Sequence, residues 1–181
     1  MELFRELNHM KCFNRTMTML VMVCLVLTAV VAANADGPAT LRFPMRCTLA
    51  AVAKKRNIQL SDSVPAPILY FESSTSVDVF KAAVKQQGHD FPQEFSNAYV
   101  YVEGKNDIFL IDNPSYYARH GRHIDDSLAH ELVHYLQVRY QKYDLNAEEF
   151  AELEAVDLQT WYRDTFMTPE NGPSPCDDLA K

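Results

Sequence analysis

Positive charge is scarce in this chain. Its 181 residues include 17 lysines and arginines against 24 aspartates and glutamates, which gives a formal net charge of −7. A protein that binds nucleic acid usually carries basic side chains that neutralise phosphates, so this acidic balance argues against DNA or RNA as a partner. The sequence also lacks internal repeats and low-complexity runs, which is inconsistent with a repeat architecture.

Long apolar runs are lacking as well. The most apolar stretch, 17–33, is shorter than the roughly 18–20 residues that a membrane span needs. Basic residues precede this stretch, and it ends in an A-x-A pattern at Ala35. These features predict a secretory signal peptide over 1–35 and a mature domain over 36–181 with no membrane anchor, exported to the periplasm or secreted. An uncleaved anchor is the alternative.

Cysteine is rare, with four residues in the whole chain. Cys12 and Cys24 fall within the predicted signal peptide, and no convincing lipoprotein signal precedes Cys24 or Cys47. Cleavage would leave Cys47 and Cys176 near the two ends of the mature domain. In an oxidising compartment we expect these two residues to form a disulfide. The alternatives are two free thiols, or Cys47 as a metal ligand.

The predicted mature domain has 146 residues, of which 14 are basic and 22 acidic, a size typical of one domain. Runs of strand-forming residues predict three strands, at 68–72, 98–103 and 108–111, with a hairpin turn over 104–107. Apolar periodicity and capping residues predict helices over 47–56, from a cap at Ser76 or Thr75 to Gly88, over 127–143 and over 147–166. A polar connection is expected over 112–122. This order predicts an α+β fold, with a small antiparallel sheet packed with helices.

The principal chemical motif is His-Glu-Leu-Val-His at 130–134. Residues four apart share one face of a helix, so His130 and His134 can bind the same Zn²⁺ ion. Glu131 would lie close to that metal without ligating it, where a carboxylate can take a proton from water. The motif therefore predicts a zinc site. The alternative is an ordinary amphipathic helix with two structural histidines.

The residues around the motif favour a helix. An apolar stripe recurs at helical spacing, and neither proline nor glycine interrupts 127–143. Asp125 or Asp126 is the expected N-cap. The two histidines and Gln137 share a face that could line a cleft.

A catalytic zinc site usually has a third protein ligand. No third histidine follows at the usual spacing, since position 140 is Tyr140. Glu152 and Glu154, on the next predicted helix, both fit the chain length that an antiparallel helix pair needs to return to the metal. They lie two residues apart, so roughly 200° separates them around the helix and only one can face the ion. Other carboxylates on this helix are Glu148, Glu149 and Asp157.

The stretches HELVHYLQ and AELEAVDLQTWY resemble the gluzincin group of zinc metalloproteins, most closely small exported domains that are called minigluzincin-like. The resemblance covers about 108–161. It implies a zincin-like fold that holds Zn²⁺ through two histidines and one glutamate: His130, His134 and Glu152. It also implies that Glu131 is the catalytic base of a metallopeptidase that hydrolyses peptides or proteins.

The resemblance favours Glu152 over Glu154, because the ligand in related families is often the first Glu of an E-x-E-A or E-x-x-A stretch. Related families also place an Asp four residues after the ligand, where it holds one histidine by its second nitrogen. This chain departs from that pattern. Position 156 is Val156, and Asp157 lies one residue further on.

Gluzincins also align their substrate on an edge strand that precedes the motif helix, which would give this role to 108–111. A tyrosine or histidine assists the oxyanion in such peptidases. The candidates for that role here are Tyr116, Tyr117, His120 and His123.

The sequence therefore predicts first an exported zinc metallopeptidase. A second hypothesis is a non-catalytic module that keeps the metal, or only the fold, for stability or partner binding. A third is a metalloenzyme of another class. Peptide deformylase also uses H-E-x-x-H, but it has an upstream cysteine ligand in a motif that Cys47 lacks, and it works in the cytosol.

Overall fold

The computed structural model describes residues 37–88, 94–102, 104–145, 150–168 and 172–179. Pro38–Lys181 form one compact unit. The predicted signal peptide over 1–35 lies outside the described residues. Among the helices that the structure describes, none is both long and apolar enough to cross a bilayer.

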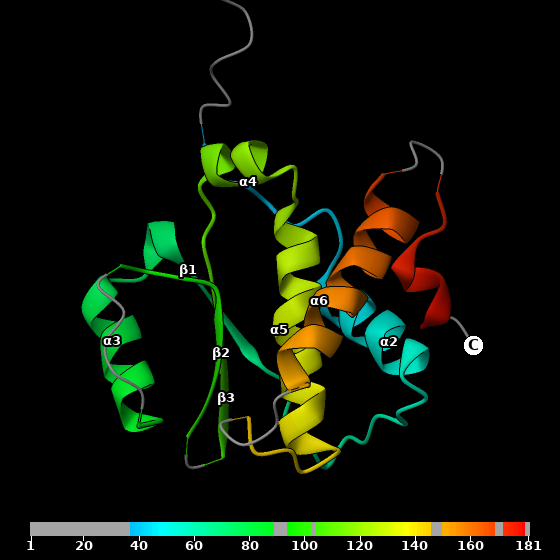
Figure 1. The fold of residues 1–181 in the computed structure, drawn as a ribbon, viewed down its shortest axis with the longest axis horizontal. Coiled ribbons are helices and arrows are strands. Elements are labelled where there is room, and N and C mark those ends of the chain that lie inside the picture. Colours follow the sequence, from blue (N-terminus) through cyan, green and yellow to red (C-terminus); the bar gives the residue numbers. More distant parts are fainter. Residues whose placement is uncertain (1–36, 89–93, 103, 146–149, 169–171, 180–181) are drawn as a thin grey trace, which may run out of the picture. The chain divides into compact units, whose positions relative to one another are not determined.

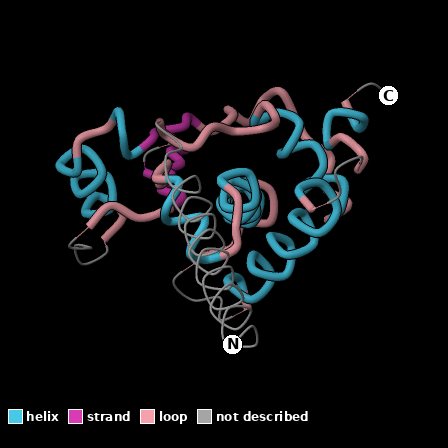
Figure 2. Tube along the Cα trace, turned by 90° about the horizontal axis from the view of Figure 1, so that it is seen from above, coloured by secondary structure: helices cyan, strands magenta, loops and turns pink. Residues whose placement is uncertain are grey.

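Helix α5, Ile124–Arg139, carries the H-E-x-x-H motif and is central to this unit, as the view almost along its axis shows (Figure 2). The predicted leucine stripe is completely buried at Leu128, Leu132 and Leu136. Burying each of these side chains contributes roughly 1.5–3 kcal/mol. From Ile124 to Gln137, only His130 and His134 are partly exposed. The helix is therefore a core element that opens to solvent at its two histidines.

The predicted N-cap of α5 is wrong. His123 caps the helix, and the side chain of Asp126 accepts a hydrogen bond from the backbone N–H of His123 at 3.3 Å. Asp125 accepts from the backbone N–H groups of Arg42 and Phe43 at 2.9 and 3.0 Å. Both aspartates lie inside the first turn, where a negative charge interacts well with the helix dipole.

The sheet is mixed, so the predicted antiparallel sheet is wrong in part. The strands are β1 (Ile68–Phe71), β2 (Ala98–Val102) and β3 (Lys105–Leu110), in the spatial order β1-β3-β2. As predicted, β2 and β3 form an antiparallel hairpin, but β1 runs parallel to β3. The physical reason is the long connection through α3, which returns the chain so that β1 pairs with the free side of β3. As a result β3 is central, and β2 is an edge strand.

The sheet lies between two helices. Helix α3, Val77–Gln86, is capped by Ser76, one of the two predicted caps, whose side chain accepts from the backbone N–H of Val79. Figure 1 shows α3 and α5 on opposite sides of the sheet. Phe109 packs with Phe80 of α3, while its neighbours Ile108 and Leu110 join the core around α5. This alternation follows from the period of two in a strand.

The expected connection over 112–122 contains a short helix, α4, Pro114–His120. The side chain of Asn113 accepts from the backbone N–H of Ser115 at 2.9 Å, and Pro114 occupies the first turn. Gly121 ends the helix in the left-handed conformation at φ 59°. These are the usual start and stop signals of a helix. Its seven residues are too few to show an apolar period.

Two more helices pack on α5, away from the sheet: α2, Met45–Lys55, and α6, Ala151–Tyr162. The part of the predicted last helix over 147–149 lies outside the described residues. A π-helical turn, Arg163–Met167, continues α6, and a 3₁₀ helix, Pro175–Asp178, follows.

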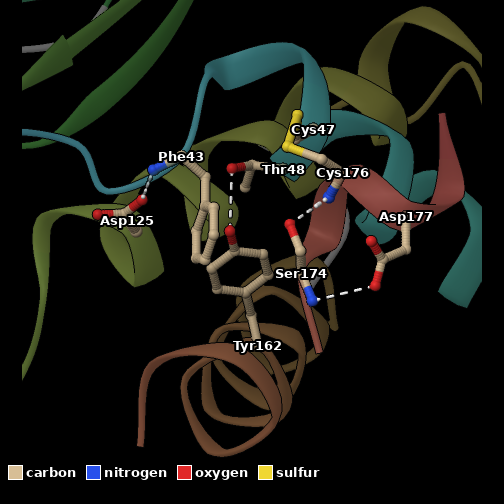
Figure 3. Close-up of a disulfide and its surroundings, with 8 residues drawn as sticks. All are labelled: Phe43, Cys47, Thr48, Asp125, Tyr162, Ser174, Cys176 and Asp177. Atoms are coloured by element: carbon tan, nitrogen blue, oxygen red, sulfur yellow. Dashed lines mark hydrogen bonds between the residues drawn. A yellow bond between two sulfur atoms is a disulfide. The ribbon is translucent and has the colours of Figure 1, made fainter. Parts of the chain in front are cut away.

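The predicted disulfide is confirmed, because Cys47 of α2 is bonded to Cys176 (Figure 3). It closes a loop with a sequence separation of 129 residues. In the simple entropic account such a loop stabilises the fold by about 4–5 kcal/mol. Beside it, the hydroxyls of Thr48 and Tyr162 share a buried hydrogen bond of 3.0 Å that links α2 to α6. Because Cys47 is in a disulfide, it is neither a free thiol nor a metal ligand.

Candidate metal centre

The two histidines of the motif converge with one glutamate. They lie four residues apart on α5, and the Nε2 atoms of His130 and His134 are 3.1 Å apart. From α6, Glu152 places Oε1 3.5 Å from Nε2 of His130 and Oε2 3.2 Å from Nε2 of His134. One ligand atom from each of the three residues lies within 4.8 Å of the other two. This group could hold a metal ion.

The donor set fits Zn²⁺. Zinc binds imidazole nitrogen and carboxylate oxygen, and catalytic zinc sites commonly have three protein ligands and one open position. The contact between the two Nε2 atoms is compatible either with one hydrogen bond or with a shared cation. At most one of these nitrogens can donate a hydrogen to the other, whereas a metal accepts the lone pairs of both.

Gln137 fixes the orientation of His134. The Oε1 atom of Gln137 lies 2.8 Å from Nδ1 of His134, and its Nε2 donates to the backbone oxygen of Ala151 at 2.9 Å and to Glu154 at 3.0 Å. Both hydrogens of the buried amide are thus used, so Oε1 must accept from Nδ1–H of the histidine. In the tautomer with Nδ1–H, the lone pair of His134 lies on Nε2, which faces the group, as a metal ligand requires.

His130 has different surroundings. Its Nδ1 is buried and has no well-formed hydrogen bond to a described residue, although the side chain of Gln159 lies beside the ring. The amide nitrogen of Gln159 donates to the buried Asp126 at 3.3 Å. Burial is the main cause that lowers the pKa of His130; the charges of His134 and Arg122 lower it further, while Glu152 and Gln159 oppose the shift. The ring is therefore held as the neutral imidazole, the form that binds metals.

Position 156 does not support a histidine. Val156 is 39 % exposed and lines the open space beside the group. Asp157 is exposed and is not a member of the ligand group. Position 156 thus lacks the carboxylate that the gluzincin pattern leads us to expect, and Gln159 of α6 lies beside the His130 ring instead.

The structure distinguishes between the two candidate glutamates. Glu154 forms an ion pair with Arg56, the C-cap of α2, at 2.5 Å, and accepts from Gln137. Glu152, on the other side of α6, faces the histidines. The ion pair with Arg56 thus holds Glu154 away from the histidines, and Glu152 is the glutamate that joins them in the candidate group. Glu148 and Glu149 lie outside the described residues.

Glu131 lies beside the ligands but is not one of them. It is 5 % exposed, and burial, followed by the nearby charge of Glu152, raises its pKa to about 8. The backbone N–H of Tyr99 on β2 opposes this shift. A bound cation would also favour the carboxylate, because an opposite charge nearby stabilises the ionised form.

An open cleft surrounds the ligand group and has two parts. A cavity of about 690 Å³ and a second of about 420 Å³ share five lining residues: Ser96, Asn97, His130, Glu131 and Glu152. Three residues of the edge strand β2 also line the smaller cavity, from Ala98 to Val100. The predicted substrate edge, 108–111, falls at the end of the central strand β3, so this prediction is wrong. The edge strand beside the cleft is its hairpin partner, β2.

The four residues suggested for the oxyanion have different positions. Tyr116 lines the larger cavity. Tyr117 is buried and donates its hydroxyl hydrogen to the backbone oxygen of Ile111. His123 caps α5, and the ring of His120 packs against Tyr116. Only Tyr116 of these four is among the residues that line the described cleft.

Three further residues at this centre were not assigned a role from the sequence. Gln137 was placed on the face of the histidines, but its hydrogen bonds depend on α6. Gln159 and Arg122 carry no motif, because their position beside His130 arises from the packing of α6 and from the end of α4. Sequence spacing gives no signal for such contacts.

The comparisons with known proteins add no identification. No protein-family model matches this chain, and no match was found among curated proteins or among solved structures. The assignment therefore depends on the fold and on the site, which define an α+β domain with a candidate centre of two histidines and one glutamate.

Proposed function

We propose that this protein is an exported zinc-dependent metallopeptidase. The observation that supports the proposal best is the convergence of His130, His134 and Glu152, with Glu131 beside them in an open cleft. The disulfide between Cys47 and Cys176 supports export, since disulfides persist mainly in oxidising compartments. The zincin-like fold implied by the motif is part of this proposal.

In this proposal His130, His134 and Glu152 would hold Zn²⁺, which would supply Lewis acidity and lower the pKa of water towards about 7. Glu131 takes a proton from the attacking water and passes it to the leaving amine nitrogen. The new bond joins the water oxygen to the peptide carbon, and the C–N bond breaks. Gln137 holds His134 in the tautomer that leaves Nε2 free for the metal.

The substrate would lie along β2. An edge strand presents unpaired N–H and C=O groups, to which an extended peptide can add by backbone hydrogen bonds. Strand β2 lines the cleft, where its Tyr99 N–H lies beside Glu131 and its Tyr101 N–H donates to Oε1 of Gln87 at 3.2 Å. An added peptide would take over these donors from the two side chains. Tyr116 is the candidate group for the oxyanion.

Glu131→Gln tests the mechanism, because glutamine keeps the shape of the side chain but cannot accept the proton. We expect zinc binding to remain and zinc-dependent hydrolysis of a mixed peptide library to fall by about 100-fold or more. The measurement is mass-spectrometric detection of products from the zinc-loaded proteins. Unchanged hydrolysis would show that Glu131 is not the base.

A non-catalytic metal-binding module is the second candidate. It is favoured by Val156, which stands where an aspartate would support a histidine, and by the incomplete hydrogen bonding of His130. In that case a chelator would lower the melting temperature of the wild-type protein, but no peptide in the library would be cleaved.

A further inference from the structure

The two parts of the cleft differ in chemistry. The residues that line only the smaller cavity are mainly apolar, and they include Phe80 and Val84 of α3, Val100 of β2, and Leu145. Tyr116, Val156 and Arg122 line the larger cavity beside the ligand group. We call these the apolar half and the Arg122 half. A substrate that crosses the metal centre would contact both.

Arg122 is the one permanently cationic side chain among the described residues that line its half. No described carboxylate lies within salt-bridge distance of its guanidinium, and no described residue hydrogen-bonds to it; its backbone N–H donates to Tyr117 at 3.1 Å. Gly121 before it ends α4 and His123 after it begins α5. The backbone is thus fixed on both sides, while the side chain is exposed and available to a ligand.

The acidic residues of the Arg122 half do not balance this charge by direct contact. Glu152 faces the two histidines. Glu131 is buried beside them. Glu94 is exposed and also lines a neighbouring hollow, which contains Arg119. An arginine fork matches the geometry of a carboxylate, so an anionic group of a substrate is its natural ligand.

The direction of the substrate follows from β2. This strand runs from Ala98 to Val102, and the residues just before it, 94–97, line the Arg122 half. Antiparallel pairing is slightly more stable per residue than parallel pairing, so a peptide added to β2 would run in the opposite direction. Its N-terminal part would then lie in the apolar half, and its C-terminal part would approach Arg122.

We propose that Arg122 binds a carboxylate on the C-terminal side of the cleaved bond, while the apolar half accepts a hydrophobic side chain on the N-terminal side. This inference rests on the proposed peptidase function and specifies its substrate class. The carboxylate is either an Asp or Glu side chain or the free C-terminus of the peptide. A free C-terminus would make the enzyme a carboxypeptidase.

The test uses four peptides that share a phenylalanine before the cleaved bond and differ only as follows. They carry either Glu or Gln after that bond, and end in either a free acid or an amide. We expect wild-type kcat/KM to be about 10- to 100-fold higher for the peptides with the recognised carboxylate, as for a hydrogen bond to a charged group. The Glu/Gln and acid/amide comparisons separate the two sources.

In Arg122→Gln the ratio between the paired peptides should fall to about one. Arg46→Gln is the matched control, because Arg46 is exposed on α2, and it should keep the wild-type ratio. A ratio that persists in Arg122→Gln would overturn the proposal. An equal loss of kcat/KM for all four peptides would also overturn it, because Arg122 would then position every substrate and would not recognise a carboxylate.

Binding separates this proposal from the catalytic one. The affinity of the zinc-loaded Glu131→Gln protein for the same peptides is measured by calorimetry, with and without Arg122→Gln. A carboxylate preference that depends on Arg122 but is accompanied by no wild-type hydrolysis would refute the peptidase function alone. Hydrolysis without the preference would refute the Arg122 proposal alone, and the absence of both would refute both.

Discussion

The two histidines of the candidate centre face the same point, but their outer nitrogens are supported differently. His134 donates to Gln137, whose amide hydrogens are both used by α6 acceptors. Gln159 lies beside the ring of His130, but the buried Nδ1 of that ring has no well-formed hydrogen bond to a described residue. A hydrogen-bonded ligand is oriented before the metal arrives. We therefore infer that the His134 side of the site is more rigid than the His130 side.

Among the variants that compare the two histidines, replacement of Gln137 should reduce zinc affinity the most. We expect Gln137→Leu to weaken zinc binding by about 10- to 100-fold, because His134 loses the acceptor that fixes its tautomer. The backbone oxygen of Ala151 and the carboxylate of Glu154 also lose a donor, which should lower the free energy of unfolding by about 1–3 kcal/mol. Competition with a chromophoric chelator measures the affinity, and urea unfolding of the metal-free protein measures the stability.

The control for this variant is Gln86→Leu, since Gln86 is exposed at the end of α3. It should change neither quantity. A zinc affinity for Gln137→Leu within about twofold of the wild type would contradict the tautomer argument, because losing this kind of support usually costs far more.

Gln159→Leu should have a smaller effect. Its contact with His130 is weaker, so we expect zinc affinity to fall by less than about 10-fold. The same chelator competition compares this variant with Gln137→Leu. If Gln159→Leu binds zinc as weakly as Gln137→Leu or more weakly, the proposed difference between the two histidines is wrong.

The sequence predicts the parts of this site that depend on local helix periodicity. It does not predict the parts that depend on contacts between residues far apart in the chain. The positions of His130, Glu131 and His134 on one helix follow from local periodicity, and the structure agrees. The third ligand was narrowed to Glu152 or Glu154 by helix geometry. The resemblance favours Glu152, and in the structure Glu154 is engaged by Arg56 at the C-cap of α2, a residue that lies far away in the sequence and has no motif.

The sheet illustrates the same limit. Strand-forming residues locate β1, β2 and β3, and the turn predicts the hairpin. Nothing local shows that β1 pairs with β3 in parallel, because that pairing depends on how α3 returns the chain. Helix α4 is not predicted for a different reason. Its start at Asn113-Pro114 and its stop at Gly121 are recognisable capping residues, but the helix is too short to show apolar periodicity.

Glu154→Gln should have the smallest effect on the metal. We expect zinc affinity to stay within about threefold, since Glu154 touches the site only through Gln137. Stability should fall by about 1–2 kcal/mol, because Arg56, whose side chain is 4 % exposed, loses its charged partner, and the 37 % exposure of Glu154 reduces the cost. Thermal unfolding and zinc competition separate the two effects. A large loss of zinc affinity with unchanged stability would reverse the assignment of the two glutamates.

Zinc titration of the metal-free protein, compared with its Glu152→Gln variant, tests the central claim most directly. The account predicts one tightly bound Zn²⁺ per wild-type chain and an affinity at least about 100-fold weaker in the variant, because one of three ligands loses its charge. A wild-type chain that binds no zinc, or a variant that binds it equally well, would contradict the assignment of this centre.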